Sequence, residues 1–242
     1  MEKKIRELAL LTIAVFMLAP TCSGQATTPQ ILKQQERYTV SLELEFNRKA
    51  GNQLERTIAV LFGADPNGYA TGFLVGDGLV MTAYHVVSGN ISDAKKMNLG
   101  FKAADQLDVK VYVKGCRARV IRVDKEADLA LLEICGSQKQ TRTPAFQSEL
   151  SKDEQLLLIA RPNGEKMVSR GIFYGSYTLR GQEYLSAKLK SRDGYSGSPV
   201  YNQKAELVGV FTGYDWTQEL ALISPGIKAQ KLLEDYRSAP KP

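Results

Sequence analysis

Three short segments carry side chains that together could break an acyl bond. They are residues 82–85 (Thr-Ala-Tyr-His), 128–132 (Asp-Leu-Ala-Leu-Leu) and 194–200 (Gly-Tyr-Ser-Gly-Ser-Pro-Val). A serine hydroxyl is a weak nucleophile until a neighbouring base removes its proton, and imidazole suits that task at neutral pH. His85 is the one histidine of the chain. We therefore expect Ser196 to be the nucleophile, His85 its base, and Asp128 the carboxylate that fixes the imidazole tautomer.

The glycine before this serine indicates how a negative charge would be stabilised. Gly194 lets the backbone turn so that the amides of Gly194 and Ser196 aim at a developing oxyanion, which is worth about 3 to 4 kcal/mol per donor. Each segment alone has a structural interpretation: the histidine packs in a core, the aspartate caps a turn, and Gly-x-Ser-Gly forms a turn. Their joint occurrence favours catalysis. Asp124 is the rival carboxylate, but only Asp128 is followed by a Leu-Ala-Leu-Leu strand.

Short β-rich runs separated by turn residues must position these side chains. They begin at Tyr38, and their spacing is typical of a sandwich or barrel rather than of alternating β/α units. The last segment is helical, with Ser224 as the expected N-cap and Pro225 in the first turn. Its expected buried face is formed by Ala229, Leu232, Leu233 and Tyr236. We expect an all-β fold with a signal peptide at 1–24, an N-terminal arm at 25–37, a first β-barrel at 38–135, an inter-barrel linker at 136–153, a second β-barrel at 154–223 and a C-terminal helix at 224–237.

The first 24 residues have the layout of a secretory signal peptide. Three basic residues precede the apolar stretch 8–19, and Pro20 and a small polar run follow it. This stretch is too short to cross a bilayer as a helix, which takes about 20 residues. We expect a secreted or periplasmic protein without a membrane span. Cys22 stands where a bacterial lipoprotein carries its lipidated cysteine, but Ala-Pro-Thr before it matches a lipobox poorly, so a lipid anchor at Cys22 is left open.

Composition argues against several other classes. A chain of 242 residues with 43% hydrophobic residues can bury a core without a disulfide scaffold. One histidine and three cysteines offer too few ligands for a zinc site, so we expect no metal and no cofactor. The net charge of +6 is not gathered into basic runs interleaved with aromatics, so we expect no nucleic acid partner.

Two cysteines remain after the signal peptide, and an even count outside the cytoplasm favours a disulfide between Cys116 and Cys135. Residues 116–123 and 128–135 resemble two strands of a hairpin closed by residues 124–127. If residues 123 and 128 pair, the two cysteines face each other with Cα atoms about 4.5 to 5.5 Å apart. A disulfide tolerates that separation. Two buried free thiols are the alternative.

The three chemical segments resemble the signatures of the chymotrypsin family, in its own chain order, and the likeness extends over residues 55–236. Residues 72–87 are similar to the Deg-type periplasmic proteases, and residues 196–200 to the secreted glutamyl endopeptidases. The resemblance implies two six-stranded antiparallel β-barrels with the active site between them and a C-terminal helix. It also implies that Phe211, Thr212 and Gly213 form an edge strand that pairs with an extended polypeptide substrate.

Some positions depart from the family pattern. Tyr195 replaces the aspartate that pairs with a new N-terminus in digestive enzymes, so activation by N-terminal cleavage is not expected. Phe211 stands where glutamyl endopeptidases carry a pocket histidine, so glutamate specificity is not supported by that route. Lys190 and Arg192 are then either the basis for an acidic preference or solvated surface charges. We predict a secreted serine endopeptidase that works through an acyl-enzyme. The alternative, if Tyr195 and Ser198 disturb the loop, is a non-catalytic protein of this fold that binds a peptide or partner in the cleft.

Overall fold

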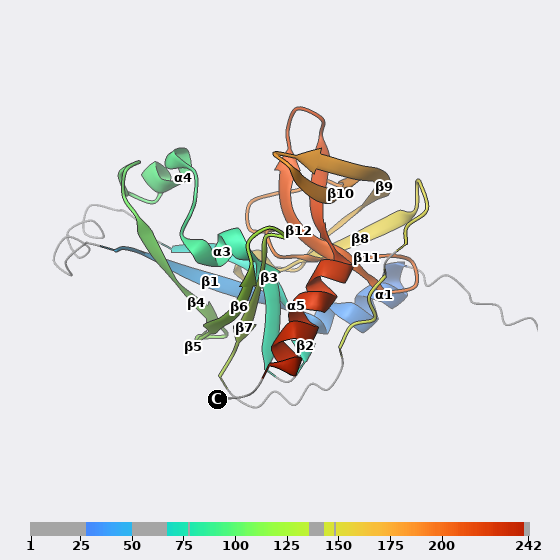
Figure 1. The fold of residues 1–242 in the computed structure, drawn as a ribbon, viewed down its shortest axis with the longest axis horizontal. Coiled ribbons are helices and arrows are strands. Elements are labelled where there is room, and N and C mark those ends of the chain that lie inside the picture. The colour runs from blue at the N-terminus through green and yellow to red at the C-terminus, as the bar shows by residue number, and fades with distance from the viewer. Residues whose placement is uncertain (1–27, 50–66, 77, 136–142, 148, 240–242) are drawn as a thin grey trace, which may run out of the picture.

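The computed structural model describes residues 28–49, 67–76, 78–135, 143–147 and 149–239, which form two lobes (Figure 1). The first lobe is one seven-stranded antiparallel sheet in the order β5-β4-β1-β2-β3-β7-β6. Its strands are β1 (Thr39–Arg48), β2 (Asn67–Gly76), β3 (Leu79–Ala83), β4 (Leu107–Val113), β5 (Cys116–Arg117), β6 (Arg119–Asp124) and β7 (Leu129–Glu133). Two short helices, α3 (Tyr84–Ser88) and α4 (Asp93–Asn98), follow β3.

The second lobe is a closed barrel in the order β10-β13-β12-β11-β8-β9. Its strands are β8 (Gln155–Ala160), β9 (Met167–Leu179), β10 (Gln182–Lys188), β11 (Pro199–Tyr201), β12 (Leu207–Asp215) and β13 (Leu220–Pro225). The predicted all-β, chymotrypsin-like fold with a C-terminal helix is confirmed. The first lobe differs in detail, because its described strands form a half-barrel of seven rather than a closed barrel of six. The strand expected at 57–62 lies outside the described residues.

Alternating side chains build the cores of both lobes. In β1, for example, Leu42, Leu44 and Phe46 are buried while Glu43 between them is exposed. One apolar cluster lies inside each lobe. A third cluster joins residues of both lobes, such as Phe73 of β2 and Leu207 of β12, and so fixes the lobes relative to each other.

Helices at both ends of the described chain pack onto this shared cluster (Figure 1). The expected N-terminal arm contains α1 (Thr28–Gln35) and the short 3₁₀ helix η1 (Glu36–Tyr38). Ile31 is buried, and Gln35 Nε2 donates to the carbonyl of Ala205 at 2.9 Å. The C-terminal helix α5 (Gly226–Ser238) buries Ala229, Leu232 and Leu233 as predicted, and Tyr236 packs beside them.

The start of α5 corrects a detail of the sequence prediction. Pro225, not Ser224, is the N-cap, and no side chain in the described part of the chain caps the helix. Ser224 belongs to β13, where it pairs with Val210, and its hydroxyl is buried without a hydrogen-bond partner among the described residues. Strand pairing therefore continues through Ser224 and Pro225, two residues beyond the predicted end of the second barrel at 223.

Cys116 and Cys135 form a disulfide, although not through the expected register. Cys116 lies in β5 and pairs with Val113 of β4, and the Cα atoms of the two cysteines are 6.0 Å apart. The turn closes with Asp124 opposite Leu129, an offset of two from the expected pairing of 123 with 128, and a bulge between Val120 and Arg122 reduces that offset to one. The predicted hairpin is therefore present, but the cysteines do not face each other across it.

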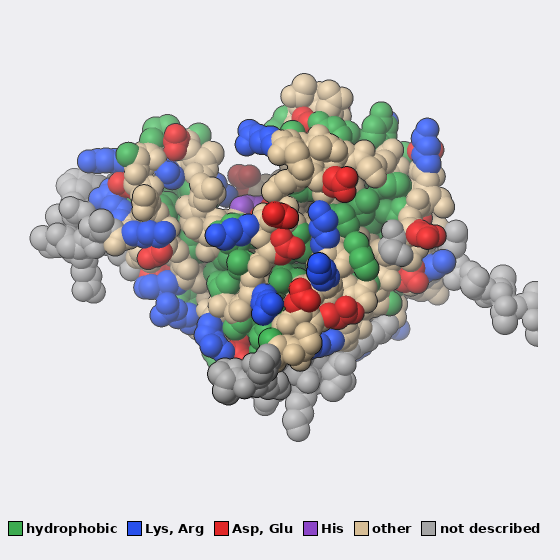
Figure 2. Space-filling model, in the orientation of Figure 1, with side chains coloured by type: hydrophobic (Ala, Val, Ile, Leu, Met, Phe, Trp, Pro, Cys, Tyr) green, Lys and Arg blue, Asp and Glu red, His purple; other side chains and the backbone are tan. Residues whose placement is uncertain are grey.

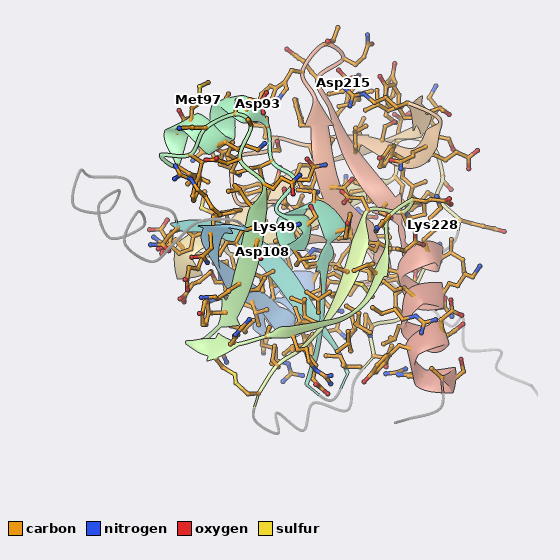
Figure 3. The ribbon with its side chains drawn as sticks, turned by 60° about the vertical axis from the view of Figure 1, so that its left-hand side comes forward. Lys49, Asp93, Met97, Asp108, Asp215 and Lys228 are labelled. Atoms are coloured by element: carbon orange, nitrogen blue, oxygen red, sulfur yellow. A yellow bond between two sulfur atoms is a disulfide. The ribbon has the colours of Figure 1, made fainter. Side chains whose placement is uncertain are left out.

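Helix α4 of the first lobe and the end of β12 of the second lobe project on either side of the space between the lobes (Figure 3). Figure 3 shows Asp93 and Met97 on α4 and Asp215 at the end of β12 at the same end of the molecule. Within the described residues, every helix is too short or too polar to span a bilayer.

Candidate active site

The pairing of β3 with β7 brings two of the predicted site residues together. Ala83 at the end of β3 faces Leu129 at the start of β7. His85 follows β3 in the single turn of α3, and Asp128 precedes β7 in a turn with φ of +53°. Ser196 comes from the other lobe, in the loop between β10 and β11. Figure 2 shows a hollow between the lobes, with the histidine colour at its floor.

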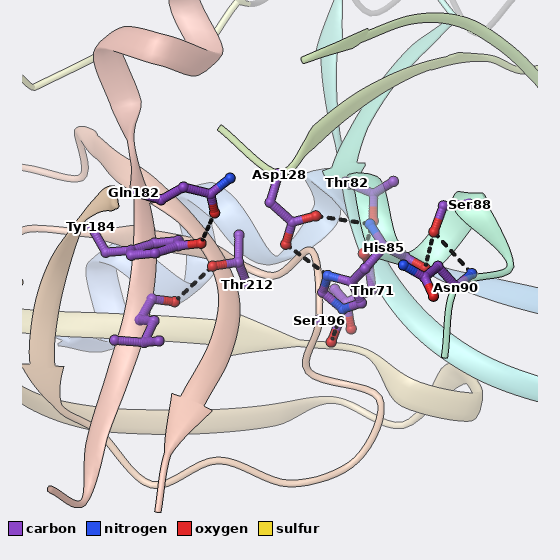
Figure 4. A network of polar contacts seen from close by, with 11 residues as sticks. Thr71, Thr82, His85, Ser88, Asn90, Asp128, Gln182, Tyr184, Ser196 and Thr212 are labelled. Carbon is purple, nitrogen blue, oxygen red and sulfur yellow. Dashed lines mark hydrogen bonds and ion pairs between the residues drawn. The ribbon is translucent and has the colours of Figure 1, made fainter. Parts of the chain in front are cut away.

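The three side chains form one hydrogen-bonded chain (Figure 4). His85 Nδ1 lies 2.7 Å from Asp128 Oδ2, and His85 Nε2 lies 2.8 Å from Ser196 Oγ. The other carboxylate oxygen of Asp128 accepts from the backbone amide of His85 at 2.8 Å. A carboxylate on Nδ1 favours the tautomer with the proton there, which leaves Nε2 to accept the Ser196 hydroxyl proton.

The rival carboxylate has a different task. Asp124 Oδ1 accepts from the backbone amide of Ala127 at 2.9 Å and so stabilises the turn between β6 and β7. Asp128 is also held through its backbone, whose carbonyl accepts from the amide of Tyr84 at 2.9 Å. Hydrogen bonds to both the backbone carbonyl and the side chain of Asp128 thus orient its carboxylate toward the imidazole.

The serine loop depends on two glycines with left-handed backbones. Gly194 and Gly197 both have φ of +84°. A methyl group at Gly197 would overlap the hydroxyl of Thr82, so this position has room for glycine alone. The amides of Gly194 and Ser196 donate to no protein group in the described part of the chain, as an oxyanion hole requires. Tyr195 is buried in the core of the second lobe, and burial raises the pKa of its phenol.

Thr71 in β2 is a site residue that the sequence did not indicate. Its hydroxyl donates to the carbonyl of Gly194 at 2.9 Å and accepts from the amide of Arg161 at 3.0 Å. Its own amide donates to the carbonyl of Ser196 at 3.0 Å, and its carbonyl accepts from the Thr82 hydroxyl at 2.8 Å. These bonds tie the serine loop to the first lobe. The bonds from Thr71 to Gly194 and Ser196 join residues more than 100 positions apart, and no local pattern carries that information.

The expected substrate strand is open over only part of its length. The amide of Phe211 donates to Ser198 and its carbonyl accepts from Gly197, each at 2.8 Å, and its side chain is buried. Phe211 therefore holds the serine loop and is not available to a substrate, which differs from the expectation. Beyond it, β12 pairs with β13 on one side, and a Cβ at Gly213 would meet open space. The free edge begins at Thr212.

Tyr184 of β10 lies across the site from Asp128 (Figure 4). Its hydroxyl donates to Gln182 at 2.5 Å. Burial, and then the negative charge of Asp128, raise the pKa of this phenol, which stays a neutral donor at physiological pH. Within the described residues, no three His, Cys, Asp or Glu side chains gather as metal ligands.

Comparison with known proteins agrees with this geometry. Residues 70–210, more than half of the chain, match the family described as Trypsin-like peptidase domain. A probable periplasmic serine endoprotease DegP-like of Pseudomonas putida is 28% identical over 147 residues, which cover 58% of this chain and 28% of that protein. A glutamyl endopeptidase of Staphylococcus epidermidis is 24% identical over 153 residues, which cover 59% of this chain and 53% of that protein.

Solved structures show the same fold. The active form of the Rv3671c protease from M. tuberculosis superposes with a TM-score of 0.62 at 17% identity, over 88% of this chain and 86% of that one. The alignments to the curated relatives span about a quarter to a half of their lengths. The match at residues 70–210 contains His85, Asp128 and Ser196. The chain belongs to the trypsin-like peptidase domain family of serine peptidases.

Proposed function

We propose that this chain is a secreted or periplasmic serine endopeptidase that cleaves polypeptides through an acyl-enzyme on Ser196. The observation that carries the proposal is the hydrogen-bonded chain from Ser196 Oγ through His85 to Asp128, with heavy-atom distances of 2.8 and 2.7 Å. The basic and apolar pattern of residues 1–24 supports export, as does the description of the DegP-like relatives as periplasmic.

In the acylation step, Ser196 Oγ attacks the carbonyl carbon of the scissile bond while His85 Nε2 takes the hydroxyl proton. Asp128 stabilises the imidazolium that forms. The carbonyl oxygen becomes an oxyanion and accepts hydrogen bonds from the amides of Gly194 and Ser196. His85 then gives its proton to the leaving amine, the carbon–nitrogen bond breaks, and an ester on Ser196 remains.

In the deacylation step, water replaces the departed amine. His85 takes a proton from this water as its oxygen attacks the ester carbon, and the same oxyanion donors act again. The proton then passes to Ser196 Oγ, which leaves and restores the enzyme. The free edge of β12 from Thr212 onward supports binding of the acyl half as an added strand, since main-chain hydrogen bonds there do not depend on sequence.

A fluorophosphonate probe tests the proposal, because it reacts with serines that a base has activated. We expect labelling of the folded protein without residues 1–24, and no labelling of Ser196→Ala. Ser191→Ala, the same substitution just upstream of the loop, is the matched control and keeps its labelling. No labelling of folded wild-type protein would refute the activity and favour the alternative, a peptidase-fold protein that only binds peptides.

A further inference from the structure

We propose that a basic groove beside the serine loop binds acidic side chains of the substrate on the leaving-group side of the scissile bond. The inference rests on the proposed peptidase activity and adds a substrate class to it. The groove has a volume of about 430 Å³ and is lined by residues of β1 and β2, the turn after β4, and the segment that follows β8. Its charged residues are Arg37, Glu43, Lys114 and Arg161.

The groove begins directly beside the proposed oxyanion hole. The 3₁₀ helix η2 (Pro162–Gly164) packs against the serine loop, so that a Cβ at Gly194 would lie 2.6 Å from Pro162 Cβ and 3.5 Å from the carbonyl oxygen of Tyr69. Tyr69 and Arg161, the neighbour of Pro162, both line the groove. A substrate held at the oxyanion hole therefore has the groove within reach of its next few residues.

The chemistry indicates which half of the substrate reaches it. The leaving amine must approach His85 Nε2 to receive its proton, and His85 is carried by the first lobe. The acyl half lies along β12 of the second lobe, on the other side of Ser196. Residues after the scissile bond thus pass over the first lobe, where Glu43 of β1 and Tyr69 of β2 line the groove.

The net positive charge of the groove favours binding of an anionic group. Arg37, Lys114 and Arg161 outnumber the single carboxylate of Glu43, and none of these cations forms an ion pair with a described carboxylate. Arg37 contacts Tyr38, through its hydroxyl at 2.8 Å and through its ring.

Arg161 is the strongest candidate to hold a substrate carboxylate. Its Nε is buried without a hydrogen-bond partner among the described residues, and its backbone amide is fixed by Thr71. The Thr71 bond fixes the backbone of Arg161, and the guanidinium of this groove-lining arginine can bind a carboxylate through two parallel hydrogen bonds. The same Thr71 hydroxyl contacts the serine loop at Gly194, so the backbone of Arg161 lies next to that loop.

Paired peptides test the proposal. Each quenched-fluorescence peptide has one cleavage site and carries Glu or Gln at one of the first four positions after it. We expect kcat/KM to be about tenfold higher for Glu than for Gln at one position at least, with a ratio that falls toward one as salt screens the charges. Arg161→Gln lowers the ratio at least about threefold, and Arg161→Glu brings it below one. Arg170→Gln, the same change at an exposed arginine of β9, leaves the ratio unchanged.

Two results would overturn the groove as a binding site. One is a ratio near one at all four positions, and the other is a ratio that survives Arg161→Gln. The same peptides are titrated against Ser196→Ala by fluorescence anisotropy, which separates binding from cleavage. An acid-selective Kd without cleavage by wild-type protein would refute the activity and support the groove. Cleavage without acid selectivity would refute the groove and support the activity.

Discussion

Thr71 should control the rate of catalysis although it does not contact the substrate. Thr71→Val keeps the shape of the side chain but removes the hydroxyl that donates to Gly194 and accepts from Arg161. Thr71 is fully buried, so both partners lose a hydrogen bond that water cannot replace. Each buried unpaired group costs about 1 to 3 kcal/mol, and we expect a total loss of about 2 to 4 kcal/mol after local relaxation. For a protein of this size, Tm then falls by about 5 to 15 °C.

The same substitution removes the hydrogen bond that holds the carbonyl of Gly194. The amide of Gly194, which is one of the two proposed oxyanion donors, then loses its fixed orientation. Loss of a whole donor lowers kcat by about 10² to 10³, so partial misalignment should lower it about 10- to 100-fold. KM for a substrate without acidic residues after the scissile bond should change little, because the free edge of β12 is untouched. Steady-state kinetics well below Tm measure both constants. Thr71→Ser restores the hydroxyl and should recover most of kcat. Equal losses in Thr71→Val and Thr71→Ser, or a lower Tm with unchanged kcat, would refute the reasoning.

Other predictions concern the loop, the disulfide and acid. Gly197→Ala forces a side chain into a left-handed backbone without room for it, so fluorophosphonate labelling should be largely lost and unfolding should become easier by about 1 to 3 kcal/mol. Cys116→Ser breaks a disulfide that joins residues 19 positions apart, and denaturant titration should show a loss of about 3 kcal/mol. The hydroxyl of Tyr177 donates to Asp215 and holds the pKa of that carboxyl below its usual range. The folded protein gains stability from this bond at pH values above the pKa of Asp215 in the unfolded chain, and loses it as the pH falls through the pKa of Asp215 in the folded protein. Tyr177→Phe should raise the pKa of Asp215 in an NMR titration of its carboxyl carbon. For wild-type protein, kcat/KM should fall as acid protonates His85, since the imidazolium cannot accept a proton from Ser196, and full activity down to the pH at which the protein unfolds would contradict its role.

Much of the fold could be predicted because it follows from patterns among residues that are neighbours in the sequence. Alternating residues such as those of β1, and turn residues between strands, indicate an antiparallel β-protein without knowledge of the pairing. The histidine, aspartate and serine segments were recognisable because each joins a chemical side chain to the strand or turn that holds it. Asp128 could be chosen over Asp124 for this reason, and the hydrogen bonds of the two residues agree with that choice.

Long-range detail could not be predicted. The hairpin closes with Asp124 opposite Leu129, an offset that the bulge between Val120 and Arg122 only partly reverses, and neither feature leaves a mark in the residue pattern. Phe211 was expected to pair with a substrate backbone, but its amide and carbonyl are bonded to the serine loop, whose path depends on contacts with the first lobe. Thr71 acts through partners that only the folded chain brings near. The sequence thus specifies the reacting groups better than it specifies what supports them.

A burst experiment tests the central claim most directly. The protein without residues 1–24 is mixed with an activated ester whose leaving group is coloured, and the product released in the first turnover is counted. We predict a burst of about one equivalent per protein, and a mass increase equal to the acyl group that peptide mapping locates on Ser196. An acyl group on another residue, or steady release with no burst and no covalent adduct under trapping at low pH, would contradict the account.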